Sequence, residues 1–112
     1  CPGAVVVLDI KGSSSIMKIL QEWGGKAIMA PSGHTMIKES MAKNNAALGG
    51  ELSCHFFFKD RYFGYDDGIY AILRLFEIIE EENKSLDMLL KILPNTINSP
   101  EFRIGCENEE KK

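Results

Sequence analysis

Three polar side chains, Glu51, Ser53 and His55, stand at alternate positions in the stretch GGELSCHFFFKD. A carboxylate accepts two hydrogen bonds at once, which suits neighbouring hydroxyl groups such as those of a sugar. The serine adds a small donor and acceptor, and histidine is the side chain best able to exchange a proton near neutral pH. These residue types predict a site that binds hydroxyl groups and transfers a proton.

The alternation predicts an extended strand over residues 51–57 with these side chains on one face. Gly49 and Gly50 come directly before it and mark a bulge or a place where something approaches the backbone closely. Cys54 would point to the opposite face, where we expect a small buried residue rather than a reactive thiol. An edge strand with one solvated face alternates in the same way, so the pattern alone leaves a purely structural interpretation open.

Strand and helix patterns alternate along the rest of the chain. Residues 4–10 form a nearly continuous apolar run typical of a central strand, and residues 26–31 predict a second strand. A further strand is expected over residues 46–60, and a last edge strand near residues 100–107. Helices are predicted over residues 13–25, 32–45, 69–83 and 85–93.

This order of elements indicates a layered α/β fold, in which a mixed, mainly parallel sheet of about four strands is packed with helices. Residues 1–104 would form one domain, followed by a C-terminal tail over residues 105–112. Serine or threonine side chains are expected to cap the first two helices, and Trp23 and the run Phe56–Phe58 to lie in the core. Because the chain starts at Cys1 and a strand follows almost at once, we expect a domain excised from a longer protein.

The charge and the cysteines disfavour several classes of protein. The 112 residues carry a formal net charge of -3 with a pI near 5.4, which gives no electrostatic footprint for nucleic acid. No apolar run approaches the roughly 18 residues that a membrane span needs. Three widely spaced cysteines (Cys1, Cys54 and Cys106) without a CxxC pair argue against a disulfide framework and structural zinc, and they fit a cytoplasmic protein.

Two adjacent carboxylates, Asp66 and Asp67, could bind a metal ion. Acidic residues directly before a helix more often cap it, because they accept hydrogen bonds from its free N–H groups. We therefore expect Asp66 or Asp67 to cap the helix predicted over residues 69–83, and we expect no metal ligand in this chain.

The stretch GGELSCHFFFKDRYFGYDDGIYAILRLFEII resembles the sugar-binding loop and following helix of the phosphomannomutase/phosphoglucomutase (α-D-phosphohexomutase) superfamily. That family carries GE(M/L)SGH, a short aromatic run, and then a Gly-Asp-Asp-Gly segment that opens a helix. Two upstream pieces match as well: Asp9-Ile10-Lys11 at the end of a strand, and Gly33-His34 at the start of a helix. Order and spacing agree across nearly the whole chain, which is similar to the third of the family's four domains.

The resemblance implies a sugar-recognition domain of an isomerase that interconverts hexose 1- and 6-phosphates by phosphoryl transfer. A phosphoserine on another domain would phosphorylate the substrate, and the bisphosphate would turn around and return its other phosphate. Magnesium would be bound by another domain, with no cofactor in this chain. The expected partners are the hexose phosphate and the other domains of a parent enzyme, without which the chain would be inactive.

The resemblance also assigns roles to single residues. Glu51 and Ser53 would hold the 3- and 4-hydroxyls of the sugar, which exchange places when the sugar turns around. His55 would act catalytically as proton acceptor or donor, and Lys11 as the positive charge where phosphoryl charge develops. His34 would contact the substrate from the N-terminus of a helix.

The chain departs from the family pattern at three points. Cys54 stands where the family usually has a glycine, and Gly12-Ser13-Ser14 stands where it often has cysteine, a small residue and arginine. The 112 residues contain no phosphoserine loop, aspartate-rich magnesium loop or C-terminal phosphate-binding loop. These departures leave open a glucose-1,6-bisphosphate synthase or phosphopentomutase branch that shares the scaffold. A separate alternative hypothesis is a catalytically silent α/β binding or interaction module that retains the scaffold.

Overall fold

A four-stranded sheet forms the centre of the chain in the computed structural model, which describes residues 2–95, 100 and 102. The strands lie in the order β2-β1-β3-β4, so the first strand of the chain is central. β1 pairs in parallel with both β2 and β3, and β4 runs antiparallel to β3. The predicted mixed, mainly parallel sheet is confirmed. Its strands are β1 (Val5–Asp9), β2 (Lys26–Ala30), β3 (Leu48–Gly50) and β4 (Phe56–Phe58).

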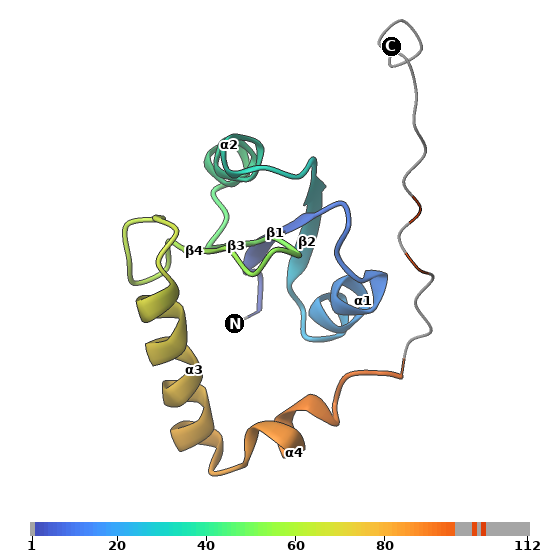
Figure 1. Cartoon of the computed structure of the whole chain (residues 1–112), viewed down its shortest axis with the longest axis vertical. Coiled ribbons are helices and arrows are strands. Elements are labelled where there is room, and N and C mark those ends of the chain that lie inside the picture. The colour runs from blue at the N-terminus through green and yellow to red at the C-terminus, as the bar shows by residue number, and fades with distance from the viewer. Residues whose placement is uncertain (1, 96–99, 101, 103–112) are drawn as a thin grey trace, which may run out of the picture.

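Helices lie on both sides of this sheet, as the layered α/β prediction requires. They are α1 (Ser14–Glu22), α2 (His34–Asn44), α3 (Gly68–Glu82) and α4 (Leu86–Leu90). Figure 1 shows α2 on one side of the sheet and the other three helices on the opposite side. α2 contacts β1, β2 and β3, whereas α1 contacts β2 and α3 contacts the edge strand β4.

The core forms where α2 meets the sheet. Ile37 and Met41 of α2 pack on Val7 of β1 and Phe57 of β4, and Ile37, Val7 and Phe57 are completely buried. Helix and sheet approach closely at Gly49, where an added Cβ would lie 2.5 Å from Met41 Sδ and 2.8 Å from Ile37 Cγ2. The close approach that the glycine pair predicted is therefore made by α2 packing on the backbone of β3.

The predicted single strand over residues 46–60 is wrong, because this segment folds into the hairpin β3–β4. Residues 51–55 form its turn, in which the Glu51 N–H donates to the His55 carbonyl and the Cys54 N–H donates to the Glu51 carbonyl, both at 3.0 Å. The polar side chains therefore project from a turn, not from one face of a strand. Apart from Pro100 and Phe102, the edge strand predicted near residues 100–107, the tail over residues 105–112, Cys1 and Cys106 lie outside the described residues.

Two predictions about single side chains also need correction. Ser13 caps α1 as expected, but Gly33 stands at the N-cap of α2 and no side chain caps that helix. Trp23 is 60% exposed because it follows the last turn of α1 and precedes Gly24, whose positive φ turns the chain away. In the phenylalanine run Phe57 is core, whereas Phe56 is 39% exposed.

Charged side chains connect the helix α3 to β4 and to the residues that follow β4, whereas much of the apolar face of the helix is exposed. Arg74 pairs with Asp60 and lies over the ring of Phe58, and Arg61 pairs with Glu77. Large apolar side chains of this helix remain exposed: Ile69, Ile72, Leu73, Leu75, Phe76 and Ile78. Among the described residues, no helix has the length and apolarity needed to cross a membrane.

Candidate functional site

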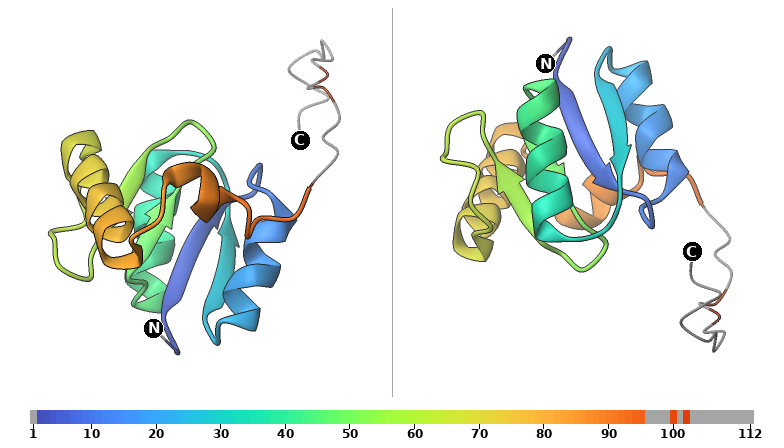
Figure 2. Two further views of the ribbon diagram at one scale, coloured as in Figure 1. Left: turned by 90° about the horizontal axis from the view of Figure 1, so that it is seen from below. Right: turned by 90° about the horizontal axis from the view of Figure 1, so that it is seen from above.

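The predicted site residues follow strands that end at one edge of the sheet. β1, β2 and β3 are parallel, so their carboxyl ends lie together, and Figure 2 shows these strands side by side with the β3–β4 turn at one end of the sheet. Lys11 comes after β1, His34 after β2, and Glu51 after β3. Ligands of open α/β sheets bind at this edge, so the placement agrees with a binding site.

A buried carboxylate, Asp9, joins the loops at this edge. It is 4% exposed, and its Oδ1 accepts hydrogen bonds from the Lys11 N–H at 2.8 Å and the Ser32 hydroxyl at 2.6 Å. The Leu52 N–H donates to Oδ2 at 3.5 Å. Burial alone would raise the pKa of Asp9, but these three hydrogen bonds and the nearby Lys11 charge outweigh it and hold the pKa below its ordinary value. Asp9 is therefore an ionised group that connects three loops.

Glu51 lies where the hairpin turn meets the N-terminus of α2. Its Oε1 accepts from the Gly33 N–H at 2.9 Å, and its Oε2 accepts from the Ser53 hydroxyl at 3.1 Å. A carboxylate has about four acceptor positions, so these two bonds fix its orientation and leave others for a ligand. The structure thus brings together Glu51, Ser53 and the first residues of α2, as the prediction of a hydroxyl-binding site requires.

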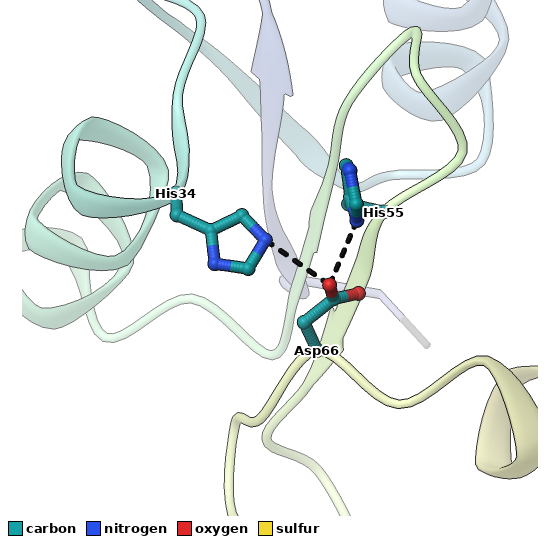
Figure 3. A group of neighbouring side chains, drawn as sticks. All are labelled: His34, His55 and Asp66. Carbon is teal, nitrogen blue, oxygen red and sulfur yellow. Dashed lines mark hydrogen bonds and ion pairs between the residues drawn. The ribbon is translucent and has the colours of Figure 1, made fainter.

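Both histidines of the chain point at one carboxylate oxygen (Figure 3). His34 Nε2 lies 3.1 Å and His55 Nδ1 lies 2.7 Å from Oδ2 of Asp66. Because an ionised carboxylate only accepts hydrogen bonds, these two ring nitrogens carry the protons. The other nitrogen of each ring is then an acceptor, and in His55 this is Nε2.

Asp66 and Asp67 have different roles, and the prediction that one or the other caps α3 is confirmed by Asp67. The Asp67 carboxylate caps α3 by accepting from the Tyr70 N–H at 3.0 Å, and it accepts from the Tyr62 hydroxyl at 2.6 Å. These bonds, the one from Tyr62 foremost, lower the pKa of Asp67. Asp66 does not cap the helix; it faces the histidines instead.

The backbone N–H of Lys11 donates to Asp9 at the edge of the site, and the Lys11 side chain is exposed. Within residues 2–95, 100 and 102 it makes no salt bridge, so the structure leaves its ammonium group available to a ligand.

Sequence reasoning missed Asp9 and Asp66 as parts of the site. A lone aspartate in the apolar run at residues 4–10 was the signal for Asp9, because a buried charge needs partners.

The turn residue Cys54 is exposed, so the prediction of a buried side chain is wrong. Its φ of 65° lies in the left-handed region, which favours glycine. A tight turn at this point explains why the family pattern that the sequence resembles has glycine here.

Comparisons with known proteins find similar domains in larger proteins. Residues 1–97 match the family model described as phosphoglucomutase/phosphomannomutase, alpha/beta/alpha domain III. The chain is 43% identical over 103 residues to the phosphomannomutase/phosphoglucomutase of Pseudomonas syringae pathovar tomato, covering 92% of this chain and 22% of that protein. It is 44% identical over 104 residues to the phosphoglucomutase of Neisseria meningitidis serogroup A, covering 93% and 22%.

A solved structure shows the same fold. The crystal structure of a phosphoglucomutase/phosphomannomutase family protein from Burkholderia thailandensis superposes with a TM-score of 0.79 at 38% sequence identity. The match covers 88% of this chain and 21% of that one. The chain therefore spans about a fifth of the length of the relatives it matches.

The first prediction concerns Asp9. Asp9→Asn places an amide N–H₂ against the Leu52 N–H and removes the charge, so we expect the free energy of unfolding at pH 7 to fall by about 2 kcal/mol. The pKa of Asp9 is lower in the folded chain than its ordinary value of 3.8, so the carboxylate contributes its full stability above that value. The difference in stability between the two chains therefore disappears as the pH falls through the lower pKa of the folded chain. Urea unfolding of both chains between pH 7 and pH 3 measures it.

The matched control for that experiment is Asp87→Asn. Asp87 is an exposed carboxylate whose side chain is 84% accessible and which pairs with Lys91 at 3.5 Å. Its loss should change stability by less than about 0.5 kcal/mol. Equal effects of the two substitutions would contradict the connecting role of Asp9.

The second prediction concerns the strained turn. Cys54→Gly removes the left-handed strain, and after the larger chain entropy of glycine is subtracted we expect a gain of about 0.5–1 kcal/mol. Cys54→Ser keeps the Cβ and the strain and should leave stability unchanged. Thermal unfolding of the unmodified chain and the two variants measures these differences in stability. A glycine variant no more stable than the serine variant would refute backbone strain at residue 54.

Proposed function

The chain belongs to the phosphoglucomutase/phosphomannomutase family, and on this premise we propose that it is the sugar-recognition domain of a phosphohexomutase. The parent enzyme interconverts hexose 1- and 6-phosphates through a phosphoserine on another domain and a bisphosphate intermediate. The observation that carries the proposal is the Glu51 carboxylate, which the Gly33 N–H and the Ser53 hydroxyl hold at the carboxyl edge of the sheet.

Glu51 and Ser53 bind the 3- and 4-hydroxyls of the sugar ring. The free acceptor positions of the carboxylate take two hydroxyl protons, and the serine hydroxyl can both donate and accept. The two sugar hydroxyls exchange places when the bisphosphate turns around, and acceptors fixed in this way serve both orientations. Mannose and glucose differ at the 2-hydroxyl, so this contact does not select between them.

The phosphate groups meet the N-terminus of α2 and the Lys11 side chain. The N-cap residue Gly33 has no side chain, and the first turn of α2 contains no acidic residue. Glu51 occupies the Gly33 N–H, and the N–H groups that follow it suit an anion. His34 is the first residue of that helix and contacts the same ligand. Lys11 adds a mobile positive charge at the same edge, where it stabilises the charge that develops during phosphoryl transfer.

His55 exchanges the proton of the reacting hydroxyl. Asp66 holds its Nδ1, so Nε2 is unprotonated and faces away from the carboxylate (Figure 3). As phosphoryl transfer proceeds, Nε2 takes the hydroxyl proton, and the Asp66 carboxylate stabilises the resulting imidazolium. Asp66 is a positioning residue in this scheme, because it acts through the histidine.

Magnesium binds to another part of the parent enzyme. The group of His34, His55 and Asp66 offers two nitrogens and one carboxylate, whereas magnesium prefers oxygen ligands, so these residues do not fit that ion. The other domains also cover the apolar face of α3, which is too large to remain in water. The cysteine pattern supports a cytoplasmic enzyme.

Binding to this chain alone gives the third prediction. Titration with glucose 1-phosphate should shift the backbone amide resonances of Gly33, Glu51 and Leu52 in heteronuclear NMR spectra. Glu51→Gln weakens the hydroxyl contacts, and we expect about tenfold weaker binding, close to 1.4 kcal/mol. Glu81→Gln alters an exposed carboxylate at the far end of α3 and should bind normally. Equal binding by both variants would remove Glu51 from the sugar site.

The fourth prediction tests the enzyme itself. The full-length parent should interconvert glucose 1-phosphate and glucose 6-phosphate, and His55→Gln in that protein should lower kcat by about 10²–10⁴ with a smaller change in KM. Glu81→Gln serves again as the control. A parent that binds sugar phosphates without interconverting any would support the silent binding module instead.

A further inference from the structure

A possible metal-binding group remains at the rim of the site. One ring nitrogen of His34, one ring nitrogen of His55 and a carboxylate oxygen of Asp66 all lie within 4.8 Å of one another. With metal–ligand bonds of about 2.0–2.1 Å, neighbouring ligand atoms around a tetrahedral or octahedral ion are about 2.9–3.4 Å apart. The two separations from Asp66 Oδ2, 3.1 and 2.7 Å, already fall close to that range.

The three side chains are held in place by a buried residue. The ring of His34 packs edge-on against the ring of Phe57 at a centroid distance of 4.9 Å, and Asp66 forms an isolated β-bridge with Phe57. His55 directly precedes β4, the strand that contains Phe57. Phe57 is completely buried and gives His34 and the backbone at Asp66 a fixed support, and the short distances to Asp66 Oδ2 keep the ligand atoms close together.

The group is also open to an ion from solvent. The side chains of His34 and His55 are 49% and 43% exposed, and that of Asp66 is 27% exposed. Water can therefore complete the coordination shell. Two imidazoles and one carboxylate suit zinc and neighbouring first-row transition metals, and they suit magnesium and calcium poorly.

We propose that His34, His55 and Asp66 form a binding site for a divalent transition metal of the zinc class, which switches the tautomer of His55. In the free protein the ring proton is on Nδ1 and Nε2 has the free electron pair. An ion on Nδ1 needs the electron pair there, so the proton of the neutral ring moves to Nε2. Metal binding itself does not depend on the mutase activity.

The consequence for catalysis, which rests on the proposed function, is inhibition. With the metal bound, His55 Nε2 carries a proton and no longer accepts one from a sugar hydroxyl. The ion also occupies the space between the two histidines that the substrate is proposed to contact. Zinc would thus act as an inhibitor at this site, separate from the magnesium that another domain binds.

Calorimetric titration of the chain with Zn²⁺ tests the site. We expect one ion per chain, no comparable binding of Mg²⁺, and at least about tenfold weaker Zn²⁺ binding in each of His34→Ala, His55→Ala and Asp66→Ala. Cys54→Ser and Asp87→Asn are the controls, because they remove the exposed turn thiol and an exposed carboxylate, and both should bind as the unmodified chain does.

Nitrogen NMR of the unmodified chain avoids any folding defect of the variants. Saturating Zn²⁺ should change His55 Nε2 from an unprotonated to a protonated ring nitrogen. Absence of Zn²⁺ binding, binding that survives loss of either histidine, binding that disappears with Cys54→Ser, or an unchanged tautomer would each overturn the proposal. Zinc binding by a chain whose parent has no mutase activity would retain the site and refute the proposed function.

Discussion

The hydrogen bonds to the Asp9 carboxylate are the interaction on which the candidate site depends. A charge on a central strand is costly to bury, and here N–H and hydroxyl donors from three different loops compensate it. Those loops carry Lys11, the N-terminus of α2 and the hairpin turn with Glu51. The ionised carboxylate therefore provides stability and also the relative placement of groups that the sheet alone would leave to flexible connections.

The sequence was sufficient for the layered fold and for several residues of the candidate site, but not for Asp9 and Asp66. Apolar runs, helix periodicity and glycine positions predicted β1, β2 and all four helices close to their observed bounds, because local patterns encode local structure. The residues Glu51, Ser53 and His55 were selected by their chemical types. The position of their turn beside Lys11 and His34 at one sheet edge follows from the parallel strands, which the alternation of strands and helices already indicated.

The sequence did not predict the hairpin or the role of Asp66, and the physical reason can be identified in each case. A turn whose left-handed residue is cysteine lacks the glycine that normally marks such turns, so Cys54 was placed on a strand. Asp66 and Asp67 are chemically identical neighbours, and only tertiary structure decides that one contacts the Tyr70 N–H and the other the histidines. The exposure of α3 likewise depends on which segments are present to cover it.

The hydrogen bonds of the site also have a kinetic consequence. Gly33 and Glu51 are 18 residues apart in the sequence, and Asp9 and Leu52 are 43 apart. Contacts between such distant residues carry a loop-closure entropy cost, and folds rich in them fold more slowly than folds built from local contacts. The candidate site therefore adds to the contact order of the fold, and it exists only when separated parts of the chain have come together.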